Sequence, residues 1–316
     1  MTHSMYHTNA LFTNTQTLLA AYPQLCVFSS YTDSELCDPK QLVGLKQSFK
    51  RAASALTTTS DNWGSLRDNG IFIAESRKVI DRAFAEHYQP FSGVIDTCWV
   101  HQNQDLIDLM AQRYPNIPFV ILNHTTMQSL TGYRTTKGPL MAFYRKPLPA
   151  PKTLLARAKR IAIFEDINNY TNMGALFRSA AALSIDAVFI TPACYDPLYR
   201  RGLRVSMGAA LQVPWTRIEA PCSQSWTDAF FPLLHEYGFT TFALALTESA
   251  YPLDDPQLPK QNKSALILGN EGAGLHTQTI EQSDYAVIIP MAHTVDSLNV
   301  ACASSVAFWE FMRHDQ

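Results

Sequence analysis

Residues 265–275 read Ala-Leu-Ile-Leu-Gly-Asn-Glu-Gly-Ala-Gly-Leu, and this stretch is the most informative part of the chain. A short apolar run, typical of a buried strand, leads into a loop with three glycines and one carboxylate, Glu271. Glycines at this spacing let a backbone turn sharply and approach a ligand, because no Cβ stands in the way. Open α/β sheets bind small molecules beyond the carboxyl ends of their strands. The stretch therefore predicts an α/β fold with a ligand site here; the alternative is an ordinary turn between a strand and a helix.

The familiar nucleotide-binding patterns do not fit this loop. A G-x-G-x-x-G pattern that begins at Gly272 needs glycine at position 277, where the chain has Thr277. The phosphate-binding pattern G-x-x-x-x-G-K-[ST] does not occur anywhere. A nicotinamide-dependent oxidoreductase, which glycine-rich strand exits could otherwise suggest, is therefore disfavoured.

A second strand–loop–helix unit follows at residues 285–303. The run 285–289 resembles a short buried strand that Pro290 ends. A helix of small residues is predicted to begin around Asp296 or Ser297, since both are good N-cap residues. Ser297 and Asn299 place short polar groups at its start. They are either site residues or simple helix-cap chemistry.

A third unit of the same kind lies at residues 161–183. A predicted strand, 161–164, gives way to a polar loop with Asn168, Asn169 and Asn172. Gly174 then opens a predicted helix whose first turns contain Arg178. The chain thus places polar side chains after three separate strands.

Together these segments resemble the three motifs of the SpoU (TrmH-type) RNA 2′-O-ribose methyltransferases of the SPOUT class. The matching patterns are Asn172-x-Gly174-x-x-x-Arg178, Gly269-Asn270-Glu271-Gly272-x-Gly274-Leu275, and Ile289-Pro290-Met291 followed by Ser297-Leu298-Asn299-Val300. The resemblance covers roughly residues 153–312, in the family's order and spacing. It implies S-adenosylmethionine-dependent 2′-O-methylation of RNA, with rRNA as the first candidate substrate and tRNA as the second. The alternative is a catalytically silent RNA-binding or ribosome-assembly factor on the same fold.

The resemblance also implies an architecture. The family has a parallel-sheet α/β domain with a C-terminal trefoil knot, which ordinary topology rules do not predict. The cofactor pocket of the family lies in that knot, and two such domains pair to build the active site. We therefore expect a homodimer with twofold symmetry.

The resemblance assigns two groups of site residues. Arg178 is expected to orient the ribose and stabilise developing alkoxide charge, because a guanidinium is effectively always protonated; literal proton abstraction stays open. The alternative is an ordinary arginine on the surface of a helix. Ile289 and Leu298 have plain core packing as an alternative role. The predicted catalytic residues are Arg178, Asn172, Glu271, Ser297 and Asn299; the predicted cofactor-binding residues are Leu246, Thr247, Leu268, Gly269, Asn270, Ile289, Met291 and Leu298.

Composition agrees with an intracellular enzyme. The chain has 316 residues, 47% of them hydrophobic and 16% charged, which suits a globular protein of two domains. No run approaches the roughly 20 apolar residues of a membrane span, and the N-terminus lacks the pattern of a secretory signal. The six cysteines are scattered without a C-x-x-C pair, so neither a metal site nor a disulfide framework is indicated. These features predict a cytoplasmic protein without a metal.

The chain is predicted to divide near residue 150, where residues 146–152 carry three prolines in alternate positions. Residues 1–150 form the first domain, in which strands alternate with helices expected over 75–86 and around 105–113. This alternation implies a mainly parallel core. This pattern resembles the L30e-like RNA substrate-binding domain of many family members, and residues 1–60 are an expected extension. Residues 151–316 form the methyltransferase domain, with strands expected at 161–164, 187–191, 241–246, 265–268 and 286–289. Helices are expected between them, one over 204–212 and another over 226–237.

A formal net charge of −2 is low for a protein that binds RNA. The charge is uneven, however, because residues 134–160 contain eight Lys or Arg and no Asp or Glu. Such a run is either a solvated surface or a phosphate contact. The residues expected to contact RNA are Arg77, Arg134, Lys137, Arg200 and Arg204.

One position departs from the family pattern. The third motif commonly has glycine two residues after the methionine, where this chain has His293. Either the loop tolerates the side chain, or the histidine alters access to the site and adds a pH-dependent charge.

Overall fold

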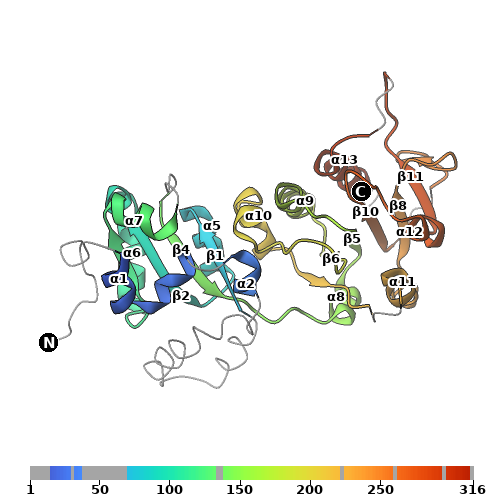
Figure 1. Cartoon of the computed structure of the whole chain (residues 1–316). Helices are drawn as coiled ribbons and strands as arrows, with labels where there is room; N and C mark the ends of the chain where they lie inside the picture. Colours follow the sequence, from blue (N-terminus) through green and yellow to red (C-terminus); the bar gives the residue numbers. More distant parts are fainter. Residues whose placement is uncertain are drawn as a thin grey trace. The chain divides into compact units, whose positions relative to one another are not determined.

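The chain contains two compact units, which Figure 1 shows in the colours of the sequence. The computed structural model describes residues 15–29, 32–37, 70–132, 138–220, 224–258, 262–293 and 297–313. The N-terminal unit comprises the chain up to Pro147 together with Leu198–Arg200; the C-terminal unit comprises Leu148–Pro197 and Arg201–Gln316. The division falls three residues before the position expected from the alternating prolines.

The N-terminal unit contains a four-stranded sheet in the order β1-β4-β2-β3. Strands β2 and β3 are parallel, but β4 lies between β1 and β2 and runs antiparallel to both. The expectation of a mainly parallel core is therefore wrong for this unit. Leu140, the first residue of β4, pairs with Glu75, the last residue of β1, so the chain enters β4 at the edge where β1 ends and must run backwards. The strands are β1 (Ile71–Glu75), β2 (Pro90–Asp96), β3 (Phe119–Leu122) and β4 (Leu140–Tyr144).

Helices of the N-terminal unit follow the strands. Two of them, α5 (Arg77–Ala85) and α6 (Gln104–Arg113), lie close to their predicted positions. The sequence did not predict α7 (His124–Thr131), which is capped by the Asn123 side chain and ends at Gly132 in the left-handed conformation.

Part of the expected N-terminal extension belongs to the core of this unit. The elements α1 (Thr15–Ala21), η1 (Pro23–Phe28) and α2 (Asp33–Cys37) bury Leu18, Leu25 and Leu36 among the sheet residues. A Cβ at Gly70 would lie 2.4 Å from the carbonyl oxygen of Leu36, so α2 and the start of β1 approach as closely as glycine allows. These described segments therefore pack into the core of the unit, and an extension within residues 1–60 stays a prediction.

The C-terminal unit contains a seven-stranded sheet in the order β7-β6-β5-β10-β8-β11-β9, with every neighbouring pair parallel. Central strands of such a sheet are covered on both faces, which is why β10 is an unbroken buried run. Five strands confirm the predicted positions, whereas the short β7 and β9 were not predicted. The strands are β5 (Arg160–Phe164), β6 (Ala187–Ile190), β7 (Trp215–Arg217), β8 (Thr240–Leu244), β9 (Tyr251–Pro252), β10 (Ser264–Leu268) and β11 (Tyr285–Ile288).

Two helix boundaries differ from the predicted ones. The helix expected over 204–212 is instead α10 (Arg200–Val205), because Met207 and Gly208 both have positive φ and interrupt it. The last helix, α13 (Val300–Arg313), begins after Asn299 rather than at Asp296 or Ser297. The other helices of this unit are α8 (Pro151–Arg157), α9 (Tyr170–Ala182), α11 (Trp226–Glu236) and α12 (Thr277–Gln282).

Helices α9 and α13 pack against each other, and both begin just after loops at the carboxyl edge of the sheet. The arrangement places the three sequence segments singled out above around one end of the sheet. The trefoil knot and the L30e-like identity of the N-terminal unit remain predictions. Within the described ranges, no helix combines the length and the apolar character needed to cross a bilayer.

Candidate functional site

A cavity of about 410 Å³ lies beyond the carboxyl ends of three neighbouring strands, β8, β10 and β11. The exit of each strand contributes to its wall, and the first turn of α13 closes one side. Because parallel strands end at the same edge, segments far apart in sequence meet there, as expected for a ligand site in an open α/β sheet. The lining residues that matter below are Leu246, Leu268, Gly269, Asn270, Glu271, Leu275, Ile289, Met291, Ser297 and Leu298.

The cavity contains seven of the eight residues predicted to bind a cofactor. Thr247 is the exception, because it follows Leu246 but does not line the cavity. Its hydroxyl oxygen is nevertheless buried and has no hydrogen-bond partner among the described residues. The seven residues in the lining are Leu246, Leu268, Gly269, Asn270, Ile289, Met291 and Leu298.

Two leucines give the cavity an unusually open apolar wall. Leu246 is 65% exposed and Leu298 is 39% exposed, although most large aliphatic side chains of this unit are buried. Apolar surface that faces water at the mouth of a cavity is typical of a ligand site, since a ligand would cover it. The side chains of these two residues are therefore not core packing.

The segment 269–276, called the cavity loop below, depends on a close approach of its own backbone. A Cβ at Gly269 would lie 2.5 Å from the carbonyl carbon and oxygen of Gly274. The Gly274 amide donates to the carbonyl of Asn270, and Gly274 has a φ of +70°. The glycine at 269 is required for the loop to close on itself, rather than for room beside a ligand, as the sequence suggested.

Three of the predicted catalytic residues meet beside the cavity. The side-chain amide of Asn299 donates to the carboxylate of Glu271 and lies 3.4 Å from Oδ1 of Asn172. These residues come from the start of α13, the cavity loop and the first turn of α9. Ser297 lines the cavity itself. Segments separated by more than a hundred residues are thus joined by direct hydrogen bonds.

Asn299 combines the two roles that the sequence left open. Its Oδ1 accepts from the backbone N–H of Ala301, which is N-cap chemistry for α13. Its Nδ2 faces the other way, toward Glu271 and Asn172. The cap therefore fixes the direction of the amide and holds its donor side at the site.

Arg178 lies elsewhere. It is exposed on α9, does not line the cavity, and makes no hydrogen bond or ion pair with any described residue. Six positions along a helix rotate a side chain by about 240°, so Arg178 points away from the direction that Asn172 takes. The structure of a single chain does not bring this residue to the cavity.

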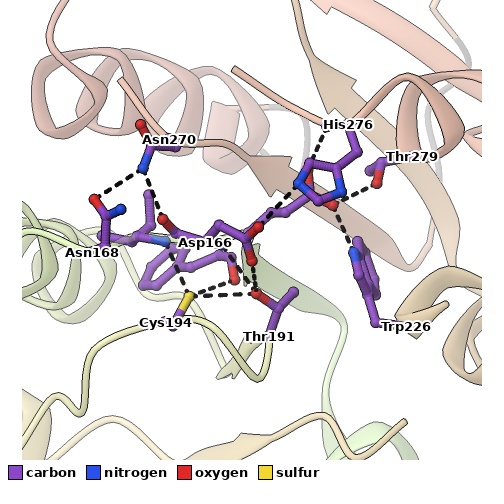
Figure 2. A network of polar contacts seen from close by, with 11 residues as sticks. Asp166, Asn168, Thr191, Cys194, Trp226, Asn270, His276 and Thr279 are labelled. Carbon is purple, nitrogen blue, oxygen red and sulfur yellow. Dashed lines mark hydrogen bonds and ion pairs between the residues drawn. The ribbon is translucent and has the colours of Figure 1, made fainter. Parts of the chain in front are cut away.

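At the exit of β5, beside the cavity loop, lies a polar network that the sequence analysis did not identify (Figure 2). The carboxylate of Glu165 is fully buried and accepts from Nε1 of Trp226 at 2.6 Å, from the hydroxyl of Thr279 at 2.5 Å and from the backbone N–H of His276 at 2.7 Å. Asp166, the next residue, contacts the side chains of Thr191 and His276. A carboxylate directly after four apolar strand residues was the available signal, but its partners lie 61 to 114 positions away.

Cys194 belongs to the same network and is inert. Its Sγ accepts from the Ile167 amide at 3.2 Å and donates to the carbonyl of Phe164 at 3.1 Å. Burial raises the pKa of the Cys194 thiol, which disfavours the reactive thiolate. The residue therefore joins the exits of β5 and β6 and has a structural role.

The predicted RNA contacts have mixed positions. Arg77 donates to the carboxylate of Asp81 at 2.6 Å and to both oxygens of Asp105, and this hydrogen bonding lowers the pKa of Asp105 to about 2. Arg200 and Arg204 both lie on α10. Arg134 and Lys137 lie outside the described residues. Arg77 thus already has two carboxylate partners, Asp81 and Asp105. Contact of any of the five residues with RNA stays a prediction.

His293 adopts the backbone conformation that favours glycine. Its φ is +57°, in the left-handed region where a Cβ is strained. Glycine, which the resemblance led us to expect two residues after Met291, would adopt this conformation without strain. The departure changes the side chain but keeps the turn.

Comparison with known proteins points to one family. The model of the SpoU rRNA Methylase family matches residues 159–309. An uncharacterized tRNA/rRNA methyltransferase of Mycobacterium bovis is 35% identical over 245 residues, which cover 77% of this chain and 81% of that protein. The 23S rRNA (guanosine(2553)-2′-O)-methyltransferase RlmP of Bacillus subtilis is 30% identical over 156 residues, which cover 49% of this chain and 59% of that protein.

A solved structure has the same fold. The AdoMet-bound rRNA methyltransferase from Sinorhizobium meliloti aligns with a TM-score of 0.65 at 19% sequence identity. The alignment covers 77% of this chain and 87% of that one. It therefore extends well beyond the residues that the family model matches.

Proposed function

This chain belongs to the SpoU rRNA Methylase family, and from that premise we propose that it transfers a methyl group from S-adenosylmethionine to a ribose 2′-hydroxyl of ribosomal RNA. The observation that carries the proposal is the convergence of the three strand exits on one cavity, with Glu271, Asn299 and Asn172 hydrogen-bonded at its side. The B. subtilis relative named above acts on the 2′-oxygen of a 23S rRNA guanosine, which supports this choice of substrate.

The cavity suits S-adenosylmethionine in size and in chemistry. A volume of about 410 Å³ is within the usual range for small-molecule sites. Leu246, Leu298 and Met291 would cover the apolar parts of the cofactor, and the backbone of Gly269 and Asn270 would face its polar parts. When bound, the sulfonium of the cofactor supplies the activated methyl group.

The side chains of this chain position the acceptor. A ribose hydroxyl is a weak nucleophile, so its reaction requires an aligned approach and stabilisation of the developing negative charge. Asn172 and Asn299 would orient the ribose, and Glu271 holds the Asn299 amide in place. Arg178 would stabilise the alkoxide while remaining protonated. Ser297, at the cavity wall, would bind the ribose or its phosphate.

Arg178 can serve this role only if a second protomer brings it to the cavity. We therefore extend the proposal to a homodimer that pairs the faces formed by α9 and α13. Val306 is 43% exposed and Trp309 is 51% exposed on α13, and α9 packs beside this helix. A partner would cover these large apolar side chains and could place Arg178 across the interface.

Mixing two inactive variants tests this arrangement. Arg178→Ala and Asn299→Ala each remove a group from what would be opposite sides of the interface. A mixed dimer then contains one intact site, so the mixture should recover up to about a quarter of wild-type activity, if half of the dimers are mixed and each has one of two sites. Absence of any recovery from dimers shown to have exchanged subunits would contradict shared sites.

The N-terminal unit is the proposed RNA-reading part of the protein. The basic residues of the run that belong to this unit, between positions 134 and 146, support this, together with Arg200. We propose an L30e-like role for the unit, a cytoplasmic location for the protein, and rRNA ahead of tRNA as its substrate. A trefoil knot around the cofactor site belongs to the same proposal.

The decisive experiment for the substrate is a map of 2′-O-methylation in rRNA and tRNA from cells with and without the gene. The proposal expects one rRNA ribose to lose its methyl group when the gene is deleted. Loss at a tRNA position would make tRNA the substrate. A catalytically silent RNA-binding factor, the alternative, would leave every site methylated and would show no S-adenosylmethionine binding by calorimetry.

A further inference from the structure

The exit of β5 contacts both ends of the cavity loop. At the beginning of the loop, the side-chain amide of Asn270 donates to the carbonyl of Asp166 at 2.9 Å and to Oδ1 of Asn168 at 3.0 Å. At its end, the backbone N–H of His276 donates to Glu165, and Nε2 of His276 lies 3.0 Å from Oδ2 of Asp166. Residues 165–168 thus hold the loop on both sides of the segment that lines the cavity.

The contacts of residues 165–168 with the two ends of the loop, called the clamp below, depend on buried side chains. Thr191 is fully buried at the end of β6, and its hydroxyl donates to Oδ1 of Asp166 at 2.8 Å while accepting from the Asp166 amide at 3.0 Å. Asp166 has a φ of +54°, a conformation that persists only where the surroundings hold it. Glu165 beside it is buried and accepts three hydrogen bonds. Figure 2 shows Asp166 in contact with Thr191 and with His276.

The Asp166–His276 pair differs from the buried contacts of Glu165 and Thr191 because water reaches it. Its side chains are 29% and 58% exposed, whereas Glu165 and Thr191 are buried. His276 follows Leu275, which lines the cavity, and precedes α12. A change at the histidine side chain can therefore loosen the end of the loop while the buried contacts remain.

We propose that Asp166 and His276 are positioning residues that hold the cavity loop in the shape that binds the methyl donor, an inference that rests on the proposed function. They contact neither the cavity nor the reacting atoms. They act through Asn270 and Leu275, the two lining residues next to the points where the clamp grips the loop. They control the affinity for S-adenosylmethionine and leave RNA binding and turnover unchanged.

The chain supplies a matched control at the opposite edge of the same sheet. Nε2 of His235 lies 3.3 Å from Oδ2 of Asp284, and the two side chains are 48% and 36% exposed. Asp284 immediately precedes β11 and also accepts from the amide and hydroxyl of Thr241 near the start of β8. The pair has the same chemistry as Asp166–His276 but lies at the end of the strands away from the cavity.

The test compares His276→Ala, His276→Gln and His235→Ala in the full-length protein. His276→Ala should weaken S-adenosylmethionine binding about threefold to fivefold by calorimetry, the size expected for a partly exposed pair. The KM for RNA and kcat at saturating cofactor should stay within about twofold. His276→Gln, which can still donate to Asp166, should restore the affinity, and His235→Ala should match the wild type.

Amide hydrogen exchange without cofactor provides a second readout. The N–H groups of Gly272 and Gly274 bond to Asn270 inside the loop, so they should exchange faster in His276→Ala and at the wild-type rate in His235→Ala. Equal affinity and equal exchange in the two alanine variants would overturn the inference, as would a loss confined to kcat. If the wild-type protein binds no S-adenosylmethionine, the proposed function fails as well; if it binds normally and only the variants disagree, the inference alone fails.

Discussion

The two edges of the C-terminal sheet use polar side chains in different ways. At the amino edge, Asp186 accepts from the backbone amides of Lys159 and Arg160, both at 2.8 Å, and Asp284 accepts from Thr241. These carboxylates bond to residues at the starts of strands and do not line the cavity described above. At the carboxyl edge, the Glu271 carboxylate meets Asn299 beside an open cavity with apolar walls.

The comparison indicates that polar side chains at the amino edge of this sheet stabilise the fold, whereas those at the carboxyl edge form the site. Amino-edge carboxylates bond to residues at the starts of neighbouring strands, 26 to 43 positions away. Carboxyl-edge side chains join segments that are distant in the sequence. At the same edge, the buried carboxylate of Glu165 accepts hydrogen bonds from Trp226 and from the end of the cavity loop. Substitutions at the carboxyl edge should therefore change binding or turnover, whereas matched substitutions at the amino edge should change stability at most.

The largest expected effect concerns Arg178, which lies on α9 outside the cavity of its own chain. Arg178→Ala should lower kcat by about 100- to 1,000-fold, the usual loss when one group that stabilises an oxyanion is removed. S-adenosylmethionine affinity should stay within a few-fold. Arg178→Lys should recover little, since an ammonium lacks the planar fork. Steady-state kinetics and calorimetry measure the two quantities, and equal loss in both would make Arg178 a structural residue.

The next effect concerns glycines on the two edges. Gly269→Ala should lower S-adenosylmethionine affinity by more than about tenfold, because the new Cβ would collide with the Gly274 backbone and open the cavity loop. Gly238, in the turn before β8, has a φ of +77° and no atom within 4 Å of an added Cβ. Gly238→Ala should cost about 1 kcal/mol of stability and leave the affinity unchanged. Similar affinities for the two variants in calorimetry would contradict the role given to Gly269.

Buried and exposed carboxylates give the third comparison. Glu165→Gln should lower the free energy of unfolding by about 2–3 kcal/mol, because an amide cannot accept from all three donors that now share the carboxylate. Asp186→Asn, at the exposed amino edge, should cost less than about 1 kcal/mol. Urea denaturation measures both. Equal losses of unfolding free energy in the two variants would mean that the buried hydrogen bonds of Glu165 stabilise the fold no more than the exposed ones of Asp186.

The smallest effect concerns two residues whose backbone angle φ is positive. His293 and Ser184 have φ values of +57° and +54°, the first beside the cavity and the second in the turn between α9 and β6. Glycine at either position should change the free energy of unfolding by less than about 1 kcal/mol, since relief of strain is offset by a freer unfolded chain. Only His293→Gly should alter the KM for S-adenosylmethionine. A change of similar size in Ser184→Gly would remove the distinction.

Much of the site could be predicted from the sequence because each motif follows an apolar strand. Strand exits in a parallel sheet meet at one edge, so Asn172, Glu271 and Asn299 were expected together, and their side chains are hydrogen-bonded. The same logic placed Leu268, Ile289 and Met291 at one cavity. Periodicity and turn residues were sufficient for the five longer strands of the C-terminal unit.

Other features depend on contacts that no local pattern records. In the sequence, Glu165 is only a carboxylate that follows an apolar strand. Its hydrogen bonds with Trp226 and Thr279 form only when distant segments fold together. The place of β4 between β1 and β2 depends on the edge at which the chain enters it. Leu18 and Leu36 join a core only because distant strands present an apolar face to them. Short strands such as β9, with two residues, have no periodicity to detect.

Transfer of a radiolabelled methyl group from S-adenosylmethionine to purified rRNA tests the central claim most directly. After alkaline hydrolysis, a 2′-O-methylated ribose protects the adjoining phosphodiester, so the label should appear in alkali-resistant dinucleotides. The wild-type protein should give this product, and Arg178→Ala should give almost none. Label recovered only in mononucleotides would identify a base methyltransferase, and no transfer to rRNA or tRNA would contradict the account.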